Sequence, residues 1–300
     1  MDQKNIYNTL FAKLEKDLSI LPDKQEENVH NTLCALWQTA AGNRVSPIAA
    51  EKLTLPELSE PQFDILQQLV DTRLSGVPLA HLTERQDFMG LDYILDKGLY
   101  IPRKETELLA QTAIDAIKTD FANTDNIAVI DLCCGIGTVA LAIAHYCKNT
   151  RVFGSDIYTP AIGAANVNAA HFSLQDRSAF FNADMYTPFE SLSLKNQISV
   201  IVSAPPYISS AKVKNMADEI AAHEPEEAFD AGPFGLSIFT VIIATAPEYL
   251  CINGYLIFEC GLGQGDFLAK RIEANGHFGV VEKFCDENGN VRVLKAKKIQ

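Results

Sequence analysis

From about residue 105 onward, short apolar runs alternate with stretches of helical apolar spacing, and this alternation limits the possible folds more than any other feature. The strand-like runs lie at residues 127–132, 152–155, 200–203 and 255–259, and the clearest helical stretches between them lie at residues 138–147 and 159–170. This pattern is typical of an α/β fold in which helices cover both faces of a parallel sheet.

The last part of the chain departs from this pattern. Residues 279–298 contain strand-like runs on either side of Asn288-Gly289, a dipeptide that favours a tight hairpin turn. We therefore expect an antiparallel hairpin that closes the sheet at the C-terminal end of the chain.

The first third of the chain is different again. Residues 1–80 show helical apolar spacing, separated by proline-containing connections, and no strand-like run. Residues 81–103 mix aromatic and β-branched residues around Gly98, which indicates a short hairpin. We predict a helical domain at 1–80, a hairpin linker at 81–103 and an α/β domain at 104–300. The helical domain either packs passively or recognises a partner, and periodicity does not choose between the two.

Composition excludes several classes of protein. The 300 residues are 47% hydrophobic and 21% charged, as in ordinary globular proteins, and carry a formal net charge of −13, which argues against nucleic acid as a partner. No apolar window is long enough to span a membrane, and the first residues do not resemble a signal peptide, so we expect a cytoplasmic protein. The seven cysteines show no C-x-x-C spacing, and we expect reduced thiols and no metal site.

A glycine-containing loop follows the first predicted strand of the α/β domain. Gly135 and Gly137 leave out side chains where backbone would approach a ligand, and the helix that follows points free N–H groups toward it. The spacing is not G-x-G-x-x-G, because Val139 and Ala140 follow, and this argues against a nicotinamide dinucleotide.

Acidic residues follow the next strands in order. Asp156 ends the second strand, where a carboxylate can accept both hydroxyls of a ribose, and Asp184 follows a third strand candidate, near the expected adenine. Each alone is as easily a helix cap or a loop acid. Together with Asp131 before the glycine loop, they indicate a cofactor that contains adenosine.

The strand at 200–203 ends in an unusual corner, Ala204-Pro205-Pro206-Tyr207. The prolines fix the backbone, so the carbonyls of Ala204 and Pro205 can serve as rigid acceptors, and Tyr207 offers a flat wall. Such a corner suits an NH₂ group that receives an alkyl group. The alternative is an ordinary turn that ends a strand next to a core tyrosine.

These residues carry a resemblance to a known family. The glycine loop, Asp156 and the proline corner resemble class I S-adenosylmethionine-dependent methyltransferases with a Rossmann-like sheet. More closely, residues 60–295 are similar to the HemK/PrmC family, which methylates the glutamine amide of peptide chain release factors. The matching segments are "IPRKETE" (101–107), "HEPEEAFDAGPFGLSIF" (223–239) and "NVRVLKA" (290–296).

The resemblance implies S-adenosylmethionine as the cofactor and a set of site residues. Those expected at the cofactor are Asp131, Cys133, Gly135, Gly137, Asp156, Ile157, Asp184, Met185 and Ser203. The corner Ala204, Pro205, Pro206 and Tyr207 is expected to hold the methyl acceptor.

Phe88, Arg103, His223 and Glu224 are weaker candidates on the acceptor side. Phe88 and Arg103 come from the resemblance alone. Phe88 is as easily a core residue, and Arg103 a partner of Glu105 or Glu107. We place His223 and Glu224 at the mouth of the site, where His223 is either a base for a hydroxyl or amine acceptor or an exposed loop histidine.

The chain departs from the family at two places. Cys133-Cys134-Gly135-Ile136-Gly137 stands where the family usually has Gly-Thr-Gly-Ser-Gly, and Ala204 stands where it has asparagine. The first change keeps the two glycines nearest the ligand, so we expect cofactor binding to survive. The second removes a side chain that holds the acceptor amide.

Three functions therefore remain open. The first is an S-adenosylmethionine-dependent methyltransferase that uses another acceptor, such as a small molecule with an amine, hydroxyl or carboxylate. The second is methylation of the release-factor glutamine, with the backbone carbonyls sufficing. The third is a protein that binds S-adenosylmethionine without turnover. Methylation of nucleic-acid bases is disfavoured by the acidic chain.

Overall fold

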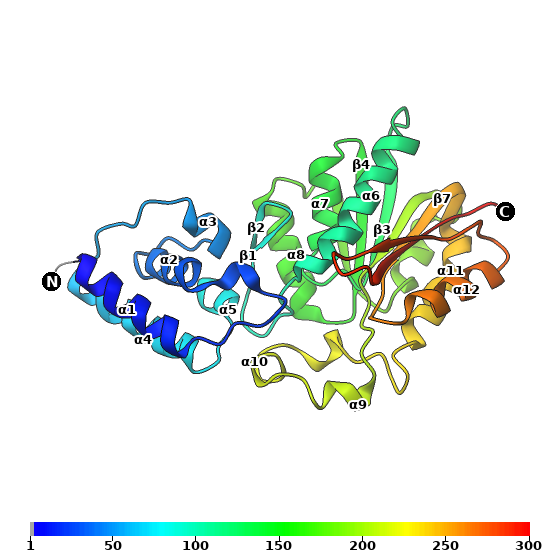
Figure 1. Ribbon diagram of the computed structural model, residues 1–300. Helices are drawn as coiled ribbons and strands as arrows, with labels where there is room; N and C mark the ends of the chain where they lie inside the picture. The colour runs from blue at the N-terminus through cyan, green and yellow to red at the C-terminus, as the bar shows by residue number, and fades with distance from the viewer. Residues whose placement is uncertain (1–2) are drawn as a thin grey trace. The chain divides into compact units, whose positions relative to one another are not determined.

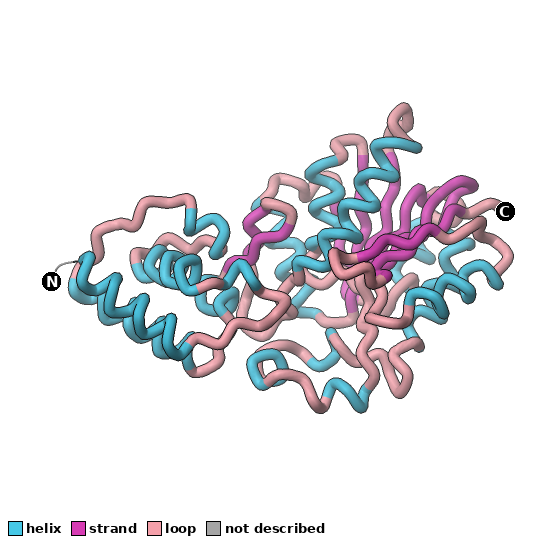
Figure 2. Tube along the Cα trace, in the orientation of Figure 1, coloured by secondary structure: helices cyan, strands magenta, loops and turns pink. Residues whose placement is uncertain are grey.

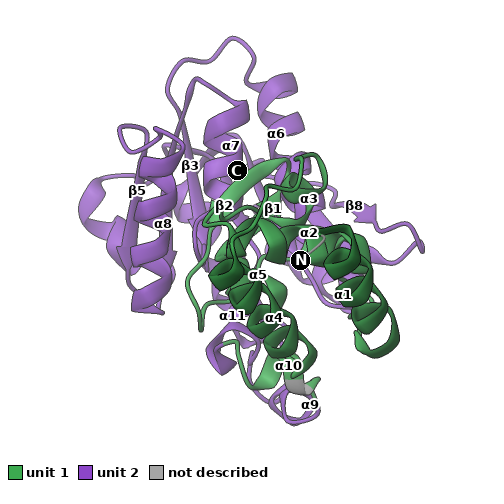
Figure 3. Ribbon diagram, turned by 90° about the vertical axis from the view of Figure 1, so that its left-hand side faces the viewer, with its two compact units in different colours: residues 1–104, 216–224 green, residues 105–215, 225–300 purple. Residues whose placement is uncertain are grey.

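The computed structural model describes residues 3–300. The chain forms two compact units (Figure 3). The first unit comprises residues 1–104 and 216–224, and the second comprises residues 105–215 and 225–300. The segment 216–224 belongs to the first unit although the residues on either side of it belong to the second.

The first unit is helical up to its hairpin, as the apolar spacing predicts (Figure 2). Its helices are α1 (Gln3–Asp17), α2 (Val29–Ala40), α3 (Pro47–Glu51), α4 (Glu60–Leu74), α5 (Leu79–Thr83) and the 3₁₀ turn η1 (Gln25–Glu27). The core forms around fully buried Trp37, whose indole N–H donates to the Pro56 carbonyl at 3.0 Å. The carbonyl partner offsets the cost of burying a polar group with the ring.

The predicted hairpin is present as β1 (Arg85–Phe88) and β2 (Leu91–Ile94). Its turn is formed by Met89 and Gly90, whose φ angles of 54° and 75° suit a tight two-residue connection. The sequence pattern did not locate this turn, and Gly98 lies beyond the second strand.

Buried charges explain why 216–224 packs with the first unit. This segment contains the short helix α10 (Asp218–Ala221), and its Glu219 carboxylate pairs with the Arg73 guanidinium at 3.2 Å. Arg73 also pairs with Glu27 at 3.0 Å, and the side chains of Arg73 and Glu27 are each only 2% exposed. A buried cation needs such partners, because leaving it unpaired away from water is costly.

The second unit is built on one seven-stranded sheet in the order β5-β4-β3-β6-β7-β9-β8 (Figure 1). The strands are β3 (Ile127–Leu132), β4 (Thr150–Asp156), β5 (Ser178–Asn182), β6 (Ile198–Ser203), β7 (Leu250–Glu259), β8 (Glu282–Cys285) and β9 (Val291–Lys297). The first five are parallel, and the last two form the antiparallel C-terminal hairpin. The predicted fold class, a Rossmann-like sheet with a closing hairpin, is confirmed.

Helices cover both faces of this sheet (Figure 1). They are α6 (Glu107–Asp120), α7 (Thr138–Tyr146), α8 (Thr159–His171), α11 (Ser237–Tyr249) and α12 (Gly265–Ala274). The short helix α9 (Ser210–Val213) and the 3₁₀ turns η2 (Lys104–Thr106), η3 (Thr187–Leu192) and η4 (Glu226–Ala228) lie in the connections. Phe239 of α11 and Leu268 of α12 pack in one core with Ile130, Ile201 and Phe258. Side chains of a strand alternate between faces, so the other set faces α6, α7 and α8.

Three further properties bear on function. Among residues 3–300, no helix is long and apolar enough to cross a membrane. Within the same residues, no cluster of histidine, cysteine, aspartate or glutamate has the geometry of a metal site. All seven cysteines are free thiols.

Candidate functional site

The sheet order reverses between β3 and β6, and this switch point positions the candidate site. Leu132 at the end of β3 pairs with Ser155 of β4 on one side and with Ser203 of β6 on the other. The residues that follow, Asp156 at the end of β4 and Ala204 directly after β6, therefore lie at the same level of the sheet. Ligands of open α/β sheets bind at such a point, beyond the carboxyl ends of the strands.

The loop after β3 has a left-handed backbone at Cys133, Gly135 and Gly137, with φ angles of 58°, 54° and 83°. A Cβ atom at Gly135 would meet nothing within 4 Å, so the backbone is open to an approaching ligand. A Cβ atom at Gly137 would instead lie 3.0 Å from the Phe180 ring. Gly137 is thus required by packing and by its φ angle, whereas the sequence suggested ligand access at both glycines.

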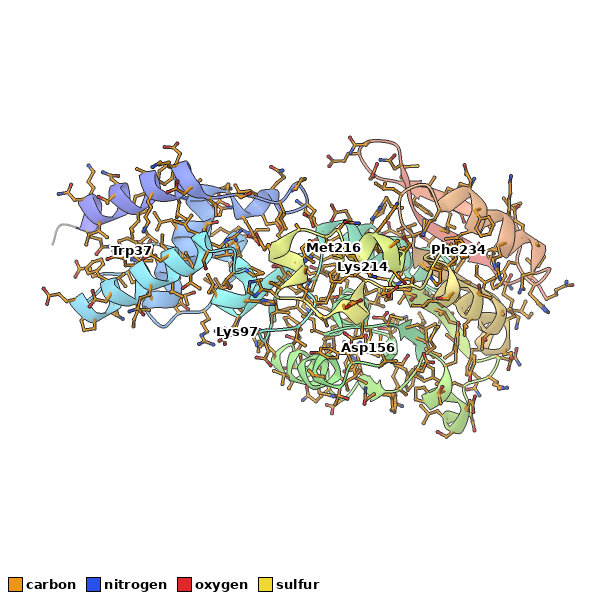
Figure 4. All side chains as sticks on the ribbon, turned by 90° about the horizontal axis from the view of Figure 1, so that it is seen from below. Trp37, Lys97, Asp156, Lys214, Met216 and Phe234 are labelled. Carbon is orange, nitrogen blue, oxygen red and sulfur yellow. The ribbon has the colours of Figure 1, made fainter. Side chains whose placement is uncertain are left out.

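Asp156, the last residue of β4 (labelled in Figure 4), ties this loop to the next one. Its carboxylate accepts hydrogen bonds from the Gly135 N–H at 2.8 Å and from the Tyr158 N–H at 2.9 Å. Burial raises the pKa of Asp156, while these backbone donors lower it. A carboxylate has about four lone-pair sites, so capacity remains for ribose hydroxyls. The side chain of Ile157 beside it is 59% exposed and offers an apolar surface.

Asp131, which the resemblance places at the cofactor, is buried at the end of β3. It is 1% exposed, and its carboxylate accepts a hydrogen bond from the Ala140 N–H at 3.0 Å, in the first turn of α7. Burial raises the pKa of Asp131 to about 8, opposed by the Ala140 hydrogen bond and reinforced by the charge of Asp156. Asp131 therefore joins the end of β3 to the first turn of α7.

The expected adenine side lies in the loop after β5. Asp184 is exposed there, and Met185 is half-buried against the core of the second unit. The sequence analysis missed Asn182, whose amide donates to the carbonyls of Asp156 at 3.1 Å and Ile157 at 2.9 Å. Its position at the end of a strand candidate was the available signal in the sequence. The Asn182 amide ties the loop after β5 to the loop after β4.

The proline corner begins directly after β6. Ser203 is buried and donates its hydroxyl to the Leu132 carbonyl at 2.8 Å, which joins the corner to the strand beside it. Ala204 and Pro206 are half-buried, and Pro205 is buried. The corner and the cofactor loop thus start from hydrogen-bonded neighbours, as the order of the motifs predicts.

Tyr207 is held by residues that the sequence analysis did not single out. Its hydroxyl accepts a hydrogen bond from Arg292 at 3.3 Å, and its carbonyl accepts one from the Gln264 amide at 3.1 Å. Arg292 is also paired with Glu259 at 3.3 Å. Burial and the Glu259 charge raise the pKa of Tyr207 to about 12, so the phenol stays protonated at neutral pH. The only signal in the sequence was the closing segment that contains Arg292.

The candidates for the acceptor side belong to the first unit, so their relation to the corner stays a prediction. Phe88 is 1% exposed and packs edge-on against the Tyr93 ring, as a core residue does. The ring of His223 lies 6.4 Å from that of His81.

Arg103 and Glu224 bind each other. Arg103 donates to Glu224 at 2.6 Å and pairs with Asp23 at 3.3 Å. Glu224 also accepts the Ile101 N–H at 2.9 Å, and its side chain is fully buried. Its carboxylate is committed to this pairing, and its place at the mouth of the site stays a prediction.

Comparisons with known proteins agree with this geometry. The family described as methyltransferase small domain matches residues 106–289. The release factor glutamine methyltransferase of Clostridium botulinum is 31% identical over 250 residues, which cover 82% of this chain and 85% of that protein. The protein of the same description from Clostridium acetobutylicum is 28% identical over 268 residues, covering 89% of this chain and 91% of the relative.

Solved structures resemble the fold more distantly. A SAM-dependent methyltransferase from Agrobacterium tumefaciens aligns with 72% of this chain and 69% of its own, at 14% identity and a TM-score of 0.47.

The switch-point site and the matching family define a methyltransferase that uses S-adenosylmethionine, which supplies a methyl group on a sulfonium when bound. Within that class, the chain belongs to the methyltransferase small-domain family and is of the HemK/PrmC type. The open backbone at Gly135 and the Asp156 carboxylate fit this cofactor.

Proposed function

We propose that this enzyme transfers the methyl group to an acceptor more nucleophilic than a glutamine amide, namely an amine, hydroxyl or carboxylate of a small molecule. The observation that carries the proposal is Ala204, at the position where the resemblance places an asparagine. In the remainder of the corner, Pro205, Pro206 and Tyr207 match the motif.

The chemistry explains why this one residue matters. An amide nitrogen is a poor nucleophile because its lone pair is delocalised into the carbonyl. Its N–H groups become more acidic as the new bond forms, so hydrogen-bond acceptors aimed at them lower the barrier. Losing one preorganised partner costs roughly 10²- to 10³-fold in rate. An amine or carboxylate has a free lone pair and depends less on that partner.

The proposed roles follow from the site. Gly135 lets the cofactor approach the loop, Asp156 binds the ribose, and Asp184 with Met185 borders the adenine. The corner carbonyls of Ala204 and Pro205 hold the acceptor in line with the sulfonium methyl, which is the positioning that displacement requires. Buried Asp131 and Ser203 support these groups, as their hydrogen bonds to Ala140 and Leu132 indicate.

A second candidate is methylation of the glutamine of peptide chain release factors. It is favoured by the relatives of that description, one of which is 31% identical over 82% of this chain. In this case the main-chain carbonyls of the corner hold the amide without the asparagine, and a release factor is the partner.

The test is methyl incorporation from labelled S-adenosylmethionine, with release factors and a small-molecule extract from the same cells offered separately. Label only in the extract supports the first proposal and identifies the acceptor. Label on the release-factor glutamine shows that Ala204 is tolerated and overturns it. Cofactor binding without label in either sample indicates a binding protein without turnover.

A further inference from the structure

Three separate loops converge on Tyr207, directly after the prolines of the corner. Gln264 is their meeting point. Its amide NH₂ donates to the carbonyls of Tyr207 at 3.1 Å and Gly235 at 3.2 Å, and its amide oxygen accepts the Gly261 N–H at 2.9 Å. One side chain therefore joins the corner, the loop before α11 and the loop after β7.

The same loops pack closely against Tyr207 at two points. A Cβ atom at Gly235 would lie 2.5 Å from the Tyr207 carbonyl oxygen, and one at Gly261 would lie 2.9 Å from its ring. Contacts under 3.0 Å are not made by real Cβ atoms. Backbone thus packs directly against both ends of this residue, and its position is over-determined.

A buried charge cluster holds the ring. The Arg292 guanidinium lies 5.7 Å from the ring centroid and donates to the hydroxyl at 3.3 Å. Its partner Glu259 accepts a hydrogen bond from Thr106 at 2.7 Å. The side chains of Arg292 and Glu259 are 10% and 4% exposed, and such charge-assisted contacts are stronger away from water.

The corner needs this support because proline has no N–H group. Pro205 and Pro206 donate no hydrogen bonds, so their backbone must be oriented through the residues on either side. Ser203 fixes the side toward the sheet through the Leu132 carbonyl. Tyr207 fixes the other side.

We propose that Gln264 and Arg292 are positioning residues for methyl transfer: acting through Tyr207, they hold the Ala204 and Pro205 carbonyls where the acceptor must sit. This inference rests on the proposed function, though not on which acceptor is used. In this role both residues act through Tyr207, to which they are hydrogen-bonded. A displacement of about 1 Å at a reacting group can cost about 10²-fold in rate.

The test compares Gln264→Glu and Arg292→Lys with wild type. The first removes the amide donors and keeps an oxygen for the Gly261 N–H; the second keeps a charge for Glu259 and loses the planar fork. Matched controls are Gln175→Glu and Arg271→Lys, exposed residues of the same unit. The measurements are kcat and KM with the acceptor that wild type labels, S-adenosylmethionine affinity by calorimetry, and hydrogen exchange.

We expect kcat to fall about 10- to 100-fold in both variants, with cofactor affinity within about twofold of wild type. The amides of Ile208 and Ser210, which bond to Phe229 and Gly232, should exchange faster. Wild-type kcat in both variants overturns the proposal, and so does an equal loss of cofactor affinity, which would indicate general loosening.

The experiments distinguish failure of the proposed function from failure of the positioning role. If wild type labels neither release factor nor extract, the proposed function fails. Hydrogen exchange still decides the positioning role, because wild-type exchange at Ile208 and Ser210 in both variants overturns it without any acceptor. If Gln264→Glu does not fold, Arg292→Lys provides the same comparison.

Discussion

The cofactor loop (133–137) and the acceptor corner (204–207) leave neighbouring strands at paired residues, yet their shapes have different origins. In the cofactor loop the shape is a property of the backbone: three left-handed residues and a main-chain N–H bonded to Asp156. In the corner the shape comes from proline rings and from distant side chains, Gln264 and Arg292.

Departures from the family pattern therefore have different consequences in the two regions. In the cofactor loop, replacing side chains leaves the backbone donors and the carboxylate in place. Cys133 even keeps the left-handed φ that explains why the family has glycine there. In the corner, Ala204 lacks the side chain that, by the resemblance, holds the acceptor amide in the family. One change there outweighs several in the loop.

The largest effect should come from restoring the missing group. In Ala204→Asn we expect release-factor glutamine methylation to rise roughly 10²- to 10³-fold, because a preorganised partner for the amide returns. Activity on a small-molecule acceptor should fall, since the larger side chain occupies its place. Labelled methyl transfer to both substrates measures this, with exposed Ala211→Asn as control. Unchanged rates on both would mean that position 204 does not face the acceptor.

Asp156→Asn tests the cofactor side. We expect S-adenosylmethionine affinity to fall roughly 10- to 100-fold, because hydrogen bonds to a charged group contribute about 1.5–3 kcal/mol. Calorimetry gives the dissociation constant, and Asp176→Asn, an exposed acid before β5, is the control. An affinity equal to wild type would show that Asp156 only organises the loop.

Gly137 and Gly163 allow a comparison between a glycine that its backbone conformation requires and one that can accept a Cβ atom without a clash. Gly137→Ala should lower the free energy of unfolding by about 1–2 kcal/mol, the cost of a left-handed residue with a Cβ atom. Its contact with Phe180 adds to this cost. Gly163→Ala, in α8 with nothing near its Cβ, should instead raise stability by roughly 0.5–1 kcal/mol. Denaturant titration of both variants checks the pair; equal effects would contradict the assignment.

The last prediction is a pH dependence from Asp131, which is small within any one pH unit. Its folded pKa of about 8 lies above the ordinary value of 3.8, so between these values the folded state holds a proton that the unfolded chain has lost. Stability should therefore fall as pH rises through this range, by at most about 1.4 kcal/mol per unit for one group. Asp131→Asn should flatten the slope between pH 5 and 6 in denaturant titrations. An unchanged slope would exclude Asp131 as its source.

Much of the fold was predictable, because strands, tight turns and helices depend on patterns among a few neighbouring residues. The strand at Ile127–Leu132 matches its prediction, as does the antiparallel hairpin around Asn288-Gly289. The turn of the first hairpin, at Met89-Gly90, was not predicted, because Gly90 and Gly98 both suit a turn locally and only strand pairing selects one of them.

In the site, too, some features follow from local sequence and others only from tertiary contacts. By itself, the sequence determined the cofactor loop and the proline corner, because backbone dihedrals and proline rings are local properties. Only the tertiary structure decided which side chains support them. Arg103 and Glu224 meet across 121 positions, and Arg292 and Tyr207 across 85, and no local spacing encodes such pairs. Folding alone brings these groups together, since they become neighbours only when the sheet and its loops assemble.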